Sequence, residues 1–325
     1  ADGQVTGLVA DVELADVRTR LAPTLPELEL PRLSGRMGWK DAAGERELAF
    51  RHVGFATATG GEQPPVDFTL RLVAPGGDRL AGGDIVFDRL ELEPLRTLAA
   101  HLPLPERVRA DLERLAPQGT LTKARLRWDG AWDQPTAFAL TTGFDRLAVA
   151  AQGNAPGIRS ASGSVDATQA GGTLRLASRN VEIDSPANFA EALAFDTLDA
   201  ELRWTRDAGR TEVRMERLAF ASPQATGSAR GTWRSLPQGP GEIDLTASIP
   251  RTDVRDLHRY LPRWLQASTR DWVRLGLVQG SGEDARLVLK GDLAHFPFTD
   301  GKRGQFLVTV KARGLYDSGN NPWTL

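Results

Sequence analysis

The sequence predicts a mainly β protein whose antiparallel sheet is built from repeated units, with short helical inserts. Three observations support this fold class. Apolar and polar residues alternate with a period of two in many short segments. Clusters drawn from 33 Gly and 20 Pro separate these segments. An internal repeat orders the segments into two similar units. The composition, 41% hydrophobic and 25% charged, is that of a globular chain that can bury a core.

The predicted strands each have one apolar face. The alternation is clearest in residues 68–72, 124–128, 200–204 and 306–312. Successive side chains of a strand point to opposite faces, so each apolar set shares one face, and polar partners such as Arg125, Arg127 and Arg203 face water. The apolar sets are Phe68, Leu70 and Leu72; Leu126 and Trp128; Leu174 and Leu176; Leu202 and Trp204; Val213 and Met215; Leu287 and Leu289; Val308 and Val310.

Turns are predicted where Gly and Pro gather between the strands. Residues 74–77, 170–172 and 237–241 combine Gly with Pro, Ala or Gln. Such clusters are typical of the tight connections between antiparallel strands.

Two stretches follow a helical spacing instead. In residues 94–116, Pro94 can occupy a first helical turn, and Leu98, Leu102, Val108 and Leu112 continue at helical spacing. Isolated helices of this length are marginal in water, so the stripe needs a partner surface. We expect the insert to cover an apolar mouth or edge of the sheet.

The second helical insert is predicted near residues 252–276. Val254 and Leu257 lie on one stripe. Ser268 and Asp271 then form a possible capping box for a helix that carries Trp272.

The repeat relates the two halves of the chain. Residues 95–103 match residues 254–262, and residues 33–39 match residues 198–204 with Trp39 and Trp204 in register. Three matching patches in the same order argue against chance. We predict a first unit over residues 1–130 and a second over residues 131–325, which together form one continuous body. In each unit we expect strands, then a pair of helices, then further strands.

Few catalytic chemistries fit this sequence. Without Cys there can be no thiolate nucleophile, disulfide or cysteine-ligated metal. A net charge of −2 argues against a nucleic-acid partner. No two of the four His have the i, i+4 spacing of a helical metal site. Gly280–Ala285 resembles a dinucleotide fingerprint but precedes a predicted strand, so we interpret it as a turn. We expect no cofactor, no metal and no enzyme.

The apolar strand faces have two interpretations. Periodicity alone favours the ordinary one, in which they form a closed sandwich core. The repeat favours the other, because units that each have one main apolar face suit an elongated, open body.

Several motifs resemble the AsmA-like proteins of the YhdP type. They include Arg259-Tyr-Leu-Pro262, Thr269-Arg-Asp-Trp272 and above all Gly291-Asp-Leu-Ala-His-Phe296-Pro297-Phe298. The order and spacing hold from about residue 30 to residue 316. The end departs from the family pattern: the family usually continues with Tyr, Gly and then Trp-Pro, whereas here Tyr316 and Gly319 are followed by Pro322-Trp323.

The resemblance implies an elongated, highly curved sheet that forms an apolar groove. It implies that the groove carries phospholipid acyl chains through the periplasm, from an inner membrane where an N-terminal helix anchors the protein, with outer-membrane components as expected partners. That anchor is missing here, so we expect an internal segment. On this hypothesis the apolar sets above line the groove. The alternative is a periplasmic scaffold that binds partners through its sheet edges and carries no lipid.

Overall fold

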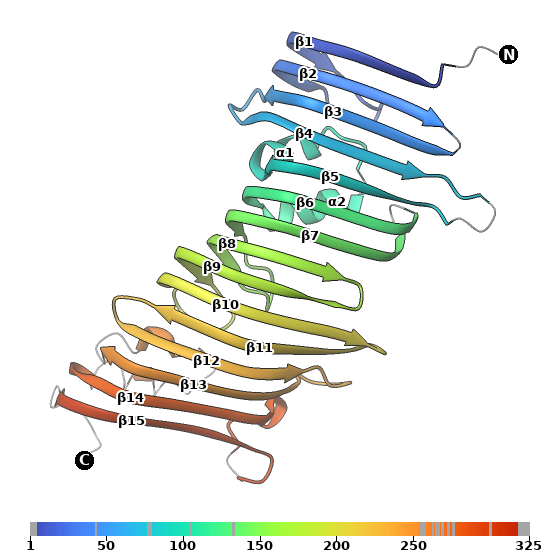
Figure 1. Ribbon diagram of the computed structural model, residues 1–325. Helices are drawn as coiled ribbons and strands as arrows, with labels where there is room; N and C mark the ends of the chain where they lie inside the picture. Colours follow the sequence, from blue (N-terminus) through green and yellow to red (C-terminus); the bar gives the residue numbers. More distant parts are fainter. Residues whose placement is uncertain are drawn as a thin grey trace. The chain divides into compact units, whose positions relative to one another are not determined.

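The computed structural model describes residues 5–42, 44–76, 80–104, 106–131, 134–253, 258–261, 263, 267, 270–271, 274, 277–298 and 301–317. Over these residues the fold is an open antiparallel sheet in which strands β1 to β15 follow one another in sequence order (Figure 1). The predicted class, a mainly β antiparallel sheet with short helical inserts, is confirmed. The predicted turn at 237–241 lies between β12 and β13. Of the turn predicted at 170–172, only Ala170 lies between β8 and β9, because Gly171 and Gly172 already belong to β9.

The elements have the following bounds: β1 Gly7–Thr19, β2 Leu28–Ala42, β3 Glu45–Ala56, β4 Glu62–Val73, β5 Gly82–Glu91, α1 Leu92–Ala99, α2 Glu106–Leu115, β6 Gln118–Ala131, β7 Gln134–Val149, β8 Gly157–Thr168, β9 Gly171–Asp184, β10 Leu193–Asp207, β11 Arg210–Ala221, β12 Ala225–Arg234, β13 Glu242–Asp253, β14 Leu277–Asp292, a 3-10 helix Leu293–His295, and β15 Gly304–Asp317.

The chain divides into two compact units. Unit 1 comprises Ala1–Ala150 with Ser164–Gln169, and unit 2 comprises Ala151–Gly163 with Ala170–Leu325. The repeat boundary at residue 130 stays a prediction.

Helices α1 and α2 form the first predicted insert, in the connection between β5 and β6. Leu92, Pro94 and Ala99 of α1 are buried, whereas α2 has no buried residue. Most of the second predicted insert, including Val254, Leu257, Ser268 and Trp272, lies outside the described residues.

Bulges interrupt several strands near the middle. In β3, Arg51 and His52 together oppose Asp67 of β4, and His52 has a φ of 52°. The backbone N–H of His52 leaves the ladder and donates to Asp67 Oδ1 at 2.7 Å. Lys123 in β6 and Asp284 in β14 take the same left-handed conformation beside register shifts. Because a bulge bends its strand and increases the local twist, these strands are not straight.

Candidate functional site: an apolar face in each unit

In unit 1, apolar side chains form continuous rows across six or seven strands. Residues that pair directly across antiparallel strands share a face, so the register defines each row. One row runs from β1 to β7 through Leu8, Trp39, Leu48, Leu70, Ile85, Leu126 and Leu140. The next runs through Ala10, Met37, Phe50, Phe68, Phe87 and Ala124. We call this side of the sheet the apolar face of unit 1.

Unit 2 has an apolar face built in the same way from β9 to β15. One row comprises Leu174, Leu202, Met215, Gly231, Leu245, Leu289 and Phe306. A second comprises Leu176, Ala200, Leu218, Ala229, Ala247, Leu287 and Val308. A third comprises Gly172, Trp204, Val213, Trp233, Ile243, Gly291 and Gly304.

The register therefore places the predicted apolar sets on one face within each unit. The five residues of unit 1 lie in the rows above or in the adjoining row of Leu72, Gly83 and Trp128. The ten of unit 2 lie in its rows, with Val310 one alternation beyond Val308. Their exposure differs: Trp128 is buried, Val308 and Val310 are 53% and 52% exposed, and the others are half-buried. Their role as a groove lining stays a prediction.

Several residues of these faces were missed by the strand patterns. Trp39, Leu48, Ile85 and Leu245 belong to the same rows as the predicted sets. A signal for Trp39 was present, because the repeat aligns it with Trp204 and both lie on an apolar face.

The accessible surface area of the chain is larger than compact proteins of this mass would have, as expected if much of each apolar face is not covered by a second layer. The chain of 35.2 kDa has an accessible surface of 20575 Å². Two separate compact proteins of half this mass would together expose about 16,000 Å². The half-buried state of most row residues agrees with it, because residues in the core of a sandwich are mostly fully buried.

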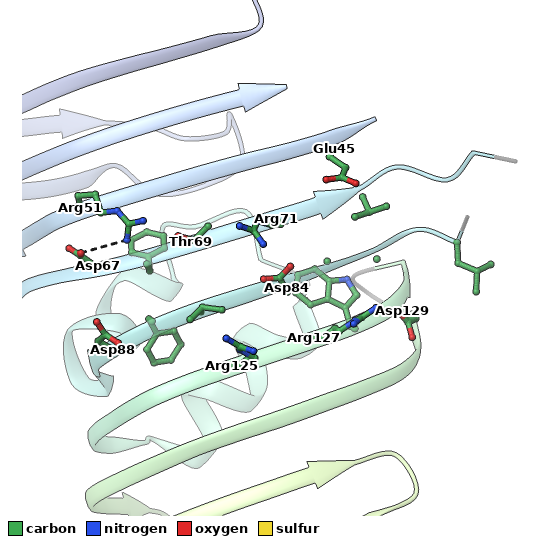
Figure 2. Close-up of a pocket in the computed structure, with 18 residues that line it drawn as sticks. Glu45, Arg51, Asp67, Thr69, Arg71, Asp84, Asp88, Arg125, Arg127 and Asp129 are labelled. Carbon is green, nitrogen blue, oxygen red and sulfur yellow. Dashed lines mark ion pairs between the residues drawn. The ribbon is translucent and has the colours of Figure 1, made fainter. Parts of the chain in front are cut away.

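The helices lie on the apolar side of unit 1. Figure 2 shows Arg71, Asp84, Arg125 and Arg127 on the near side of β4, β5 and β6, with the helices behind the strands. These four residues alternate with the apolar rows, so the helices are on the apolar side. Helix α1 contacts β6. The insert thus covers part of the apolar face, as expected for its stripe.

The opposite side of each sheet, which we call the charged face, is covered by exposed ion pairs. In unit 1, Arg36 Nε lies 2.7 Å from Asp11 Oδ1, and Arg71 Nε lies 2.9 Å from Glu47 Oε2. The hydrogen bond from Arg36 lowers the pKa of Asp11. In unit 2, Arg234 donates to Glu212 at 3.1 Å and lowers the pKa of that carboxyl group.

A concavity of about 1040 Å³ opens on the charged face of unit 1 (Figure 2). Charges of opposite sign alternate along one of its rows, where Arg71, Asp84 and Arg127 oppose one another. Arg51 lies 3.6 Å from Asp67 at its edge. Apolar residues, among them Val73, Leu80 and Val86, line the hollow together with these charged groups.

The structure also bears on the nucleotide-binding, metal-binding and membrane-spanning features considered in the sequence. The predicted turn at Gly280–Ala285 is wrong: these residues lie inside β14, and a bulge at Asp284 absorbs the irregularity. The extended backbone offers no helix N-terminus for a pyrophosphate. Among the described residues no group of three or more His, Cys, Asp or Glu could hold a metal ion. No described helix is long and apolar enough to span a membrane.

The motif Gly291–Phe298 has a structural explanation. The Asp292 carboxylate accepts a hydrogen bond from the Ala294 N–H at 2.9 Å and begins the 3-10 helix. This turn returns Phe298 to the sheet, where a Cβ on Gly291 would lie 3.2 Å from its ring. Phe296 contacts both Phe298 and Phe306, with ring centroids 5.7 and 5.1 Å apart. The motif thus adds aromatic surface at one end of the unit 2 rows.

Comparison with known proteins gives one match. A family model described as YhdP protein matches residues 1–315. No curated protein and no solved structure matches the chain.

Proposed function

Because the chain belongs to the YhdP family, a lipid-transport family of the cell envelope, we propose that its apolar faces hold phospholipid acyl chains. In this proposal the chain is a segment of a periplasmic protein, anchored in the inner membrane, that carries phospholipid towards the outer membrane. It acts by binding and has no catalytic role.

The continuous apolar rows are the observation that supports this proposal. An acyl chain gains about 0.8 kcal/mol for each methylene removed from water. A gap that exposed five methylenes would cost roughly 4 kcal/mol and slow passage by about three decades. A conduit therefore needs an apolar surface without polar interruptions. In unit 1, the row from Leu8 to Leu140 crosses seven strands without a polar residue.

Native mass spectrometry of protein purified without detergent tests the proposal. Co-purified phospholipid, released on activation in the gas phase, is the expected result. A mass equal to that of the bare chain in every charge state would favour the scaffold hypothesis. A variant with Leu70 and Leu126 both changed to Ser is the matched control, and it should lose the adduct.

A further inference from the structure

Several aromatic rings of the apolar faces lie over glycines of a neighbouring strand. In unit 2, Phe220 of β11 pairs with Gly227 of β12. A Cβ built on Gly227 would be 2.7 Å from both Cε1 and Cζ of Phe220. In unit 1, Gly83 pairs with Trp128, and a Cβ there would overlap the indole. Each ring occupies the space that a side chain on the glycine would fill.

The two positions differ in what the backbone allows: a Cβ on Gly83 would lie 2.5 Å from the backbone O of Arg71 as well as against the indole, whereas Gly227 has no backbone contact that close. Neither Gly83 nor Gly227 has a φ in the left-handed region, unlike thirteen other glycines of the described chain. Position 227 is the more permissive of the two, because the nearest backbone atom to its built Cβ, Ser248 O, is 3.0 Å away. The ring of Phe220 is therefore the main neighbour that a side chain at position 227 would displace.

The Phe220 ring is also confined on one side. Phe195 packs against it edge to face, with centroids 5.6 Å apart and planes at 73°. Carbon atoms in contact prefer separations of about 3.5–4.0 Å, so a methyl group at position 227 would raise the ring by about 1 Å. With Phe195 beside it, the ring would move away from the sheet, towards the space above the apolar face.

We propose that Gly227, and Gly83 in the other unit, are clearance positions: they let Phe220 and Trp128 lie flat, and thereby set the depth available to an acyl chain. The proposal rests on the proposed function and adds specificity-determining residues to it. The glycines touch no lipid. They act through the rings that they seat.

The test uses the full chain with a photoreactive amino acid at Met215 and vesicles of phosphatidylethanolamine and phosphatidylglycerol. Gly227→Ala should lower the lipid adduct by about tenfold, the effect of exposing roughly two methylenes. Adding Phe220→Ala should restore it, because the displaced ring is then gone. Gly38→Ala is the matched control, since Gly38 pairs with Val9 on the other face and its built Cβ meets only ordinary contacts of 3.6 Å or more.

Each outcome has a defined meaning. An undiminished adduct in Gly227→Ala, or a loss that Phe220→Ala does not reverse, overturns the clearance role. A loss in Phe220→Ala alone would make that ring a direct lipid contact and overturn it as well. A chain that carries the photoreactive amino acid at Met215 or at Leu70, with both glycines intact, serves as the reference. If neither position gives a lipid adduct, the proposed function is refuted instead. If Gly227→Ala does not fold, Phe220→Trp places a larger ring on the intact seat, and an unchanged adduct there overturns the proposal.

Discussion

The two faces of each sheet differ in how they are stabilised, although the same strands build both. In β10, Leu202 and Trp204 lie in apolar rows, whereas Glu201 and Arg203 alternate with them and form an exposed ion pair at 3.0 Å. Exposed ion pairs contribute little to stability. Burial on the apolar face must therefore provide most of the side-chain stabilisation. The face that we propose for lipid is thus also the core of the unit, and experiments must separate these two roles.

The largest expected effect comes from a charge placed on the apolar face. Leu126→Asp and Leu202→Asp should each block lipid passage, because an unpaired carboxylate in an apolar channel costs several kcal/mol. The fold should remain, because an open face lets water reach the carboxylate when no lipid is bound. Thermal melts and lipid photocrosslinking in cells, from the same two positions, measure both effects.

Thr173→Asp is the control for Leu202→Asp. Thr173 pairs with Arg203 on the charged face, so the new carboxylate gains a partner and lipid passage should continue. Unfolding of the two leucine variants, or the absence of a lipid adduct at all apolar positions, would contradict the open-face model and favour a closed core.

Truncation of neighbouring residues should show the difference in stability directly. Leu70→Ala should lower the free energy of unfolding by about 1–2 kcal/mol, less than for a fully buried leucine because Leu70 is half-buried. Arg71→Ala, on the other face, should change it much less, since its partner Glu47 is an exposed surface group. Urea denaturation of both variants gives the comparison. Equal losses would mean that the charged face stabilises the unit as much as the apolar face.

The helical insert of unit 1 should respond to lipid. Helix α2 has no buried residue, so its amides should exchange hydrogen faster than those of β6 in lipid-free protein. Phospholipid on the apolar face should slow or accelerate this exchange, according to whether it binds beneath the helices or displaces them. Hydrogen exchange with and without lipid measures this. Full protection that lipid does not alter would identify the insert as plain core with no gating role.

The smallest effect is expected on the charged face under acid conditions. The lowered pKa of Glu212 means that its ionised form is favoured in the folded state. Its contribution is therefore present above the unfolded pKa of about 4.3 and is lost as the pH falls through the lower folded value. Glu212→Gln should melt slightly below wild type at pH 7, and the two should converge near pH 2. A difference that persists at pH 2 would assign the effect to packing.

Much of the sheet could be predicted because period-two alternation depends only on local sequence. The sets around Leu70, Leu126 and Leu202 were assigned to one face from spacing alone, and the register agrees. The bulges could not be predicted from the sequence. Their left-handed residues are His52, Lys123 and Asp284, and none of them is a glycine, the residue that would signal such a backbone. The turn prediction for Gly280–Ala285 is wrong because its Gly-rich sequence resembles a turn, whereas pairing with β13 and β15 keeps the segment in a strand. The ring over Gly227 depends on pairing between strands, which no local pattern contains.

The strand order has a consequence for how the chain acquires its structure. Each strand pairs with its neighbours in sequence, so every hairpin can form without waiting for a distant segment. Folds with such low contact order close short loops and fold comparatively fast. A chain that emerges progressively from its N-terminus can therefore add one strand at a time to the growing edge. Each newly formed edge would serve as the template for the strand that follows, and the apolar rows would lengthen in the same order as synthesis.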